Sequence, residues 1–254
     1  MILRRIVENL RTQNWTAIAI ELVIVVIGVF LGTQVANWNV SRLEKAETER
    51  LLVQLVPELK GQIHYFDTSR VYFATTRRFA EQALATWKGN RQLSDEQFVI
   101  AAYQASQIIG IGVNAENWAI TFGAEQLRDI ADPQVRRNLE LAMTQDYGGV
   151  QADAVATPYR EQVRRVIPID LQDSIRRECG DRQIRNTFST YLPPVCSVRL
   201  PPAQAKATAA ALKARPDLAG ELTWHLAAIA VYLDNAAVLE TPIRALHRDL
   251  KGLS

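Results

Sequence analysis

Apolar residues are distributed unevenly along the chain, and their longest run lies near the N-terminus. Over residues 22–31 only Gly28 interrupts it. The wider segment 15–38, read as a helix rising 1.5 Å per residue, spans roughly 35 Å, which is enough to cross a bilayer. Trp15 and Trp38 stand at its two ends, where amphipathic rings suit the headgroup regions. The pattern predicts an uncleaved transmembrane helix over residues 15–38.

Two other interpretations of this segment fit less well. A cleavable signal peptide needs small residues before the cut, and Gln34, two residues before Ala36, is a poor match. A helix buried in a soluble core would not need tryptophan at both ends. Residues 1–14 carry apolar residues at helical spacing together with three arginines, which predicts an amphipathic segment on an anionic membrane face.

The orientation of the span is predicted from its basic N-terminal side. Lys and Arg residues close to the two ends of the span are equal in number, so the positive-inside rule alone does not decide. Because the basic segment 1–14 is short and lies against the membrane, we expect it to be cytoplasmic. Residues 39–254 then form an extracytoplasmic domain.

Small residues within the span predict close contact with another helix. Gly28 and Gly32 form a G-x-x-x-G, Ala36 extends it by a turn, and Glu21 lies seven residues before Gly28 on nearly the same face. Small residues four apart let two helix backbones approach, and a polar group on that face can bond across the interface. The alternative is that these glycines reflect only the general frequency of Gly in such helices. The predicted partners are the bilayer and either a second copy or another membrane protein.

The rest of the chain predicts an all-α domain. After the span, Leu52, Leu55, Leu59, Ile63 and Phe66 keep helical spacing, and Pro57 is expected to kink that helix or restart it. The last segment alternates spacings of four and three without a miss at Leu218, Leu222, His225, Ile229, Tyr232, Ala236, Leu239, Ile243, Leu246 and Leu250. Shorter helices are expected at 95–109, 133–147, 150–166 and 170–179, with irregular chain at 181–201. The helix at 150–166 is expected either to be continuous or to restart at Thr157-Pro158. The prediction is a transmembrane helix followed by a helical bundle whose first and last helices are long.

Charge and motifs exclude several function classes. The chain has 29 Lys and Arg against 27 Asp and Glu, and residues 39–254 hold 26 and 25, so a nucleic-acid interface is not expected. The sequence has no H-E-x-x-H, G-x-S-x-G or P-loop motif, and no metal or cofactor is expected. Gly110, Gly112 and Ala115 spell a dinucleotide-like fingerprint, but no βαβ pattern surrounds them.

A few side chains remain as candidates for bonding or binding. Cys179 and Cys196 would pair in an oxidising compartment and would stay as thiols in the cytoplasm. The aromatic stripe containing Tyr65 and Tyr72 is typical of a core and could alternatively line a ligand pocket. If the first and last helices pack antiparallel, His64 and His225 could meet in a pH-sensitive contact, although an ordinary core histidine is the commoner case.

One segment resembles a known family. Glu21, the V-I-G of the apolar run, Gln34 and the ending Asn37-Trp38-Asn39 resemble the anchor of an uncharacterised bacterial family, and residues 118–139 carry a weaker likeness. The resemblance implies a single-pass inner-membrane protein with a helical extracytoplasmic domain and no known activity. We therefore expect a non-enzymatic, membrane-anchored interaction protein. The alternatives are a ligand-binding sensor that signals through a partner and an enzyme whose site is assembled from distant residues.

Overall fold

The structure, a computed structural model, describes residues 15–90 and 92–252. The predicted amphipathic segment 1–14 lies outside the described residues. The all-α class is confirmed, since most of the described chain is helical and its strands are two residues long. The helix expected at the N-terminus and the long helix expected at the C-terminus are both present.

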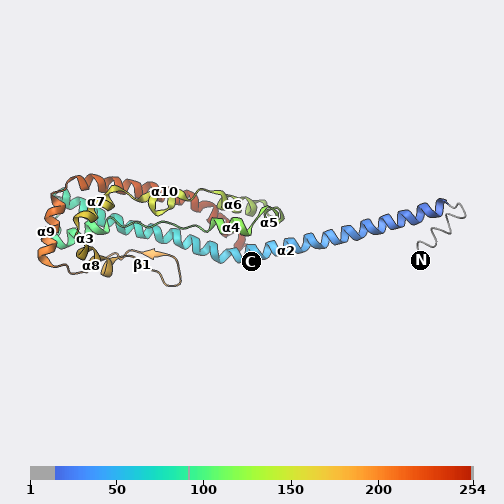
Figure 1. Cartoon of the computed structure of the whole chain (residues 1–254), viewed down its shortest axis with the longest axis horizontal. Coiled ribbons are helices and arrows are strands. Elements are labelled where there is room, and N and C mark those ends of the chain that lie inside the picture. The colour runs from blue at the N-terminus through green and yellow to red at the C-terminus, as the bar shows by residue number, and fades with distance from the viewer. Residues whose placement is uncertain (1–14, 91, 253–254) are drawn as a thin grey trace.

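The helix α2 (Trp15–Trp87) dominates the molecule. Its N-terminal half projects from one end of the domain as a stem, and its C-terminal half runs the length of the domain (Figure 1). The chain continues helically through Pro57, so the expected restart of the helix is wrong. Proline has no backbone N–H, so Pro57 cannot donate the usual helix hydrogen bond to the carbonyl of Val53. Val53 lies on the exposed face of α2.

The C-terminal half of α2 is buried along one face, which we call the inner seam. Its positions alternate spacings of three and four, the pattern of a helix that follows a neighbour over many turns. All of them are buried except the last, which is partly buried: Leu52, Leu55, Leu59, Gln62, Phe66, Ser69, Phe73, Thr76, Ala80, Ala83 and Trp87. The aromatic rings of Phe66, Phe73 and Trp87 on this face therefore belong to the core.

The helix α10 (Asp217–Lys251) packs antiparallel to α2, and its end lies near the base of the stem (Figure 1). The predicted seam of α10 is buried at every position except Leu239, which is partly buried. The Phe73 and Tyr232 rings lie 5.1 Å apart between centroids. Glu240, also buried, accepts hydrogen bonds from Arg70 of α2 and from Arg244. These contacts fix the register of the two long helices.

Shorter elements complete the domain. They are α3 (Asp95–Gln104), α4 (Ala115–Thr121), α5 (Ala124–Asp129), α6 (Pro133–Thr144), η1 (Gly148–Val150), η2 (Ala152–Val155), α7 (Pro158–Val166), α8 (Ile169–Cys179), β1 (Arg182–Gln183), β2 (Thr190–Tyr191) and α9 (Pro202–Lys213). The capping box of Ser94 and Gln97 starts α3, and the Asp132 side chain caps α6.

Four expectations for the middle of the chain are corrected. The helices at 95–109 and 133–147 end earlier, at Gln104 and Thr144. A continuous helix over 150–166 is wrong, since two 3-10 turns precede α7. The helix α7 begins at Pro158, at the restart that was the alternative, because proline suits the first helical turn. The segment 181–201 is not wholly irregular, since β1 and β2 pair antiparallel within it.

Candidate functional site

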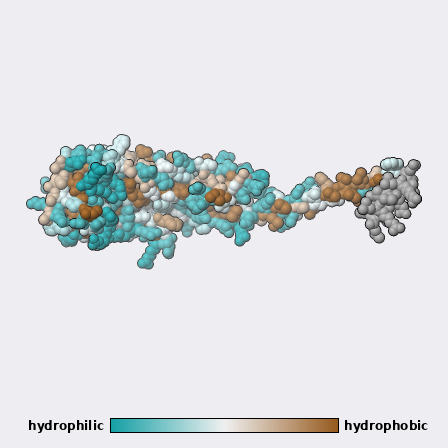
Figure 2. Space-filling model, viewed as in Figure 1, coloured by the Kyte–Doolittle hydropathy of each residue, from teal (hydrophilic) through white to brown (hydrophobic). Residues whose placement is uncertain are grey.

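The first candidate surface is the apolar N-terminal part of α2. Between Ile18 and Glu47 no residue is buried, and Leu22, Phe30 and Leu31 are each more than half exposed. Figure 2 shows this stretch as a hydrophobic band on a stem that carries no other part of the described chain. A soluble protein rarely exposes so much contiguous apolar surface, and such a surface marks a membrane or protein contact.

Two helices of the described chain are long and apolar enough to cross a membrane, namely α2 and α10. They differ in how their surfaces are used. The most apolar window of α2 is wholly unburied, whereas α10 packs its seam against α2 and α6 within the domain. The N-terminal part of α2 therefore fits a membrane span better than α10 does.

The residues predicted for helix association lie in the exposed stem. At both Gly28 and Gly32 an added Cβ would meet no described atom within 4 Å beyond the helix's own backbone, so this face is open to another helix. One carboxylate oxygen of Glu21 has no hydrogen-bond partner among the described residues. Ala36, Trp15 and Trp38 are exposed on the same stem. The Arg42 guanidinium lies 5.9 Å from the centre of the Trp38 ring.

The second candidate is a groove of about 940 Å³ at the stem end of the domain, a volume in the range of small-ligand sites. We call it the α2 groove. Its walls are the outer side of α2, the chain leading into α4 and the loop between β1 and β2. Its lining residues are Pro57, Glu58, Gly61, Gln62, His64, Tyr65, Gly112, Val113, Asn114, Asn117, Trp118, Asn186, Thr187, Phe188 and Ser189.

Hydrogen bonds from α2 hold the far wall of the groove in place. Gln62 donates to the Gly112 carbonyl at 2.9 Å, and the Tyr65 hydroxyl donates to the Gly110 carbonyl at 2.7 Å. The Trp118 ring nitrogen donates to Glu58 at 3.1 Å. Burial raises the pKa of the Tyr65 hydroxyl, which keeps it protonated as a donor.

The sequence singled out four side chains that could face a ligand, namely His64, Tyr65, Tyr72 and His225. Two of them line this groove and two do not. His64 and Tyr65 lie in it, whereas Tyr72 is fully buried and its hydroxyl donates to Asp181 at 2.8 Å. Phe188, which forms one wall of the groove, was not singled out from the sequence. This ring is 91% exposed on the β1–β2 loop, and its place in an otherwise polar run is the one signal that could have singled it out.

His225 does not meet His64, so the alternative of a histidine contact is wrong, and His225 is instead a buried histidine of the core. The two long helices are antiparallel, but Asp67 pairs with Arg244 and Phe73 with Tyr232, which places His225 much farther along α2 than His64. The His225 Nδ1 atom lies 2.7 Å from the Thr157 hydroxyl, and its ring stacks on Tyr159. Burial, with a smaller effect of Arg160, lowers the pKa of His225 to about 4.

Because the pKa of His225 is lowered in the folded chain, we expect the domain to lose stability as the pH falls from 6.5 towards 4. Over that range the unfolded chain, with a pKa of 6.5, takes up the proton while the folded chain does not. The difference corresponds to about 3 kcal/mol when it is fully developed below pH 4, and to about 2 kcal/mol between pH 7 and pH 5. The measurement is urea unfolding of the detergent-solubilised chain at pH 7 and pH 5. His225→Gln should flatten this dependence, and an unchanged slope in that variant would contradict the assignment.

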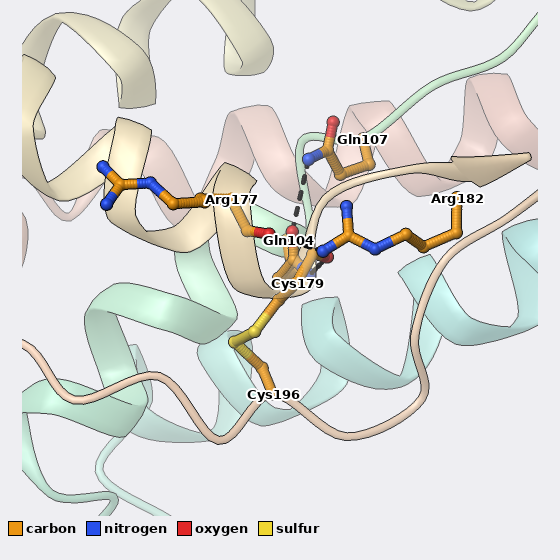
Figure 3. The surroundings of a disulfide bond; sticks show 6 residues. All are labelled: Gln104, Gln107, Arg177, Cys179, Arg182 and Cys196. Atoms are coloured by element: carbon orange, nitrogen blue, oxygen red, sulfur yellow. Dashed lines mark hydrogen bonds between the residues drawn. A yellow bond between two sulfur atoms is a disulfide. The ribbon is translucent and has the colours of Figure 1, made fainter.

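A disulfide bond joins Cys179 and Cys196, the pair that the sequence singled out. Cys179 is buried at the end of α8 and its carbonyl accepts from Gln104 at 2.6 Å, while Gln107 donates to the Gln104 side chain (Figure 3). The bond closes the loop that contains β1 and β2. It therefore ties the Phe188 wall of the α2 groove to the buried end of α8.

Replacing both cysteines by serine should lower the free energy of unfolding by about 3 kcal/mol. The expected loss follows from the entropy that a cross-link over 17 residues removes from the unfolded chain. Urea unfolding followed by circular dichroism measures it. Adding a reductant to the unmodified chain is the matched control and should produce a similar loss, whereas equal midpoints for all three samples would show that the bond contributes nothing.

Arginines from α7 and α8 surround the end of α3. Arg160 donates to the Ser106 carbonyl, and Arg164 donates to the Ser106 hydroxyl and to Gln107. The Arg164 guanidinium also lies 4.9 Å from the centre of the Tyr103 ring. Burial lowers the pKa of both arginines. Because their donors are used on protein acceptors, these arginines serve chiefly to hold the end of α3.

Within residues 15–90 and 92–252, no group of three or more His, Cys, Asp and Glu side chains is arranged to hold a metal ion. Comparison of the chain with protein-family models, curated proteins and solved structures found no match to any of them.

Proposed function

We propose that this chain is a membrane-anchored, non-enzymatic interaction protein that docks on a second copy or on another membrane protein. The observation that carries the proposal is the exposed apolar part of α2, which is continuous with the helix at the centre of the domain core. An anchor built from the same helix as the core fixes the position and tilt of the domain relative to the membrane. Such a rigid connection suits a protein that presents a surface to a partner.

Residues 15–38 are the proposed span, with residues 1–14 in the cytoplasm and the domain of residues 39–254 outside the inner membrane of a bacterium. The resemblance of the Glu21 to Asn39 segment to a bacterial anchor supports this assignment. The Cys179–Cys196 disulfide supports an oxidising compartment, because cytosolic thiols are kept reduced. The helical domain is proposed to be a bundle around α2 and α10.

Protease added to intact spheroplasts tests this orientation. The domain should be digested from outside, leaving a membrane-bound fragment. If the domain were digested only after the inner membrane had been opened, it would lie in the cytoplasm. The proposed orientation would then be wrong, and an oxidising compartment would no longer explain the disulfide.

Affinity purification of the full chain in a mild detergent tests the docking itself. A specific partner, either a tagged and an untagged copy together or another membrane protein, should copurify. Gly28→Leu is expected to reduce its recovery because a leucine side chain separates the helix backbones. Leu31→Ala, a change elsewhere in the span, is the matched control. Recovery of the chain alone, unaffected by either change, would overturn the proposal.

A ligand-binding role is the second candidate, and the α2 groove favours it. The groove is large enough for a small molecule, and its lining combines aromatic rings with side-chain amides. A thermal-shift screen of metabolites against the full chain tests this role. A hit should be lost in Phe188→Ala and retained in Phe30→Ala, whose exposed ring lies on the stem; no hit, or a hit that survives Phe188→Ala, would count against the groove.

A further inference from the structure

A glycine lies on the α2 wall of the α2 groove although the helix itself does not require one. Gly61 is in the interior of α2, where glycine is less favourable than alanine because it loses more backbone freedom on folding. Its φ is not in the left-handed region that favours glycine. A Cβ added at Gly61 would meet no described atom within 4 Å beyond the helix's own backbone, so close packing does not require glycine either. The missing side chain does leave this wall of the groove open.

The loop between β1 and β2 holds an aromatic ring at another wall of the groove. Phe188 is 91% exposed, and hydrogen bonds fix the backbone around it. The Ile184 N–H donates to the Ser189 carbonyl at 2.9 Å, and the Thr187 N–H donates to the Ile184 carbonyl at 3.1 Å. Asn186 has a φ of 60°, a left-handed conformation that asparagine tolerates better than most residues. An apolar ring that an ordered loop exposes to water can bind a ligand without further loss of backbone freedom.

The polar side chains of the groove are mostly amides, which both donate and accept hydrogen bonds. The amides that line it are Gln62, Asn114, Asn117 and Asn186. Gln62 donates to the Gly112 carbonyl at 2.9 Å, and Asn117 donates to the Asn114 oxygen at 2.6 Å, which fixes the direction of these groups. Hydroxyl groups also both donate and accept, so a ligand that carries several hydroxyls matches a row of amides.

The charge of the groove disfavours anionic ligands. Glu58 is the only Asp, Glu, Lys or Arg among its lining residues, and its carboxylate accepts a hydrogen bond from Trp118 at 3.1 Å. A phosphate or carboxylate ligand would meet this negative charge with no Lys or Arg of the lining to pair with it. An extended peptide also fits poorly, because β1 and β2 are each two residues long and offer little edge for an added strand.

We infer that the α2 groove binds a neutral carbohydrate. This inference rests on the ligand-binding role, the second of the two proposed functions, and names the class of ligand. One face of a sugar ring stacks its C–H groups on Phe188, because the face of an aromatic ring carries negative charge density. The sugar hydroxyls bond to Asn114, Asn117 and Asn186. The open wall at Gly61 leaves room for the sugar ring.

Binding of neutral oligosaccharides to the full chain tests this inference. The probes are immobilised trisaccharides of glucose, mannose, galactose and N-acetylglucosamine, and the chain is solubilised in a detergent without a sugar headgroup so that the detergent does not compete. At least one probe should bind. Phe188→Ala should weaken that binding about tenfold. Asn186→Gly, which keeps the left-handed backbone, should weaken it about fivefold. Trp224→Ala, which removes a 62% exposed ring of α10, is the matched control and should bind normally.

Substitutions of Gly61 separate the groove from the stability of the fold. Alanine and leucine both favour a helix more than glycine does, and the space beside Gly61 is open. Gly61→Ala and Gly61→Leu should therefore unfold at urea concentrations no lower than the unmodified chain. Gly61→Leu should lose most of the oligosaccharide binding, because its side chain enters the groove, and Gly61→Ala should lose less. Binding that survives both Gly61→Leu and Phe188→Ala would overturn the inference.

The remaining outcomes distinguish the class of ligand from the ligand-binding role. If none of the trisaccharides binds but a peptide or an anionic metabolite does, and Phe188→Ala weakens that binding, the groove is a binding site and carbohydrate is the wrong class. If neither the trisaccharides nor any compound of the metabolite screen binds, the inference and the ligand-binding role are both wrong. The membrane anchor and the docking have their own tests and are unaffected by either result.

Discussion

Two arginines in the middle of the apolar span, Ile24→Arg with Ile27→Arg, are expected to abolish stable membrane association. Each arginine at the centre of a membrane helix costs about 3 kcal/mol in insertion, and each lost isoleucine removes a favourable contribution. Together they should shift the insertion equilibrium by at least about four orders of magnitude. Alkaline extraction of membranes measures the result: the unmodified chain should stay in the pellet, and the double variant should be released or degraded.

The matched control for this prediction is Ile24→Ala with Ile27→Ala. It alters the same positions and leaves a span that is still apolar over its remaining length, so it should stay in the pellet. If the double arginine variant resists extraction as well as the control, residues 15–38 are not the membrane anchor.

Phe73→Ala is expected to lower the free energy of unfolding of the domain by about 3–5 kcal/mol. Its ring is 1% exposed and lies between Tyr72 and Tyr232, at 5.5 and 5.1 Å between centroids, so its removal leaves a cavity where α2 meets α10. Urea unfolding of the solubilised chain measures the change. Val71→Ala, two residues away on the same helix and 64% exposed, should cost less than about 0.5 kcal/mol. Similar losses for the two variants would show that α2 does not pack on α10 in this register.

The two long helices could be predicted because their burial follows their sequence spacing. On α10 the run of threes and fours from Leu218 to Leu250 matches the buried face almost residue by residue. The stem was predicted for a related reason, since a mostly apolar segment long enough to cross a bilayer has few uses in a soluble core. Ser94 and Asp132 marked helix starts correctly because a cap is a local interaction.

The parts that could not be predicted depend on contacts between distant segments. The α2 groove forms only where the Asn186 to Ser189 loop and the Gly112 to Trp118 segment meet α2, and no spacing in the sequence relates them. The contacts of His225 depend on the register between α2 and α10. The spacing of apolar residues in each helix does not determine that register. The restart at Thr157-Pro158 could be predicted from the proline. The 3-10 turns before it could not, because a proline disfavours the α conformation only at the residue before it and periodicity does not separate the two helix types.

The mass of the complex that the chain forms in its own membrane bears most directly on the proposed function. Native mass spectrometry of membrane vesicles, without prior detergent extraction, gives that mass. We expect a complex of more than one chain, made either of two copies or of this chain with another membrane protein. Gly28→Leu and Glu21→Ala should shift the population towards the single chain. A single chain in the unmodified membrane, unchanged by either substitution, would contradict the account.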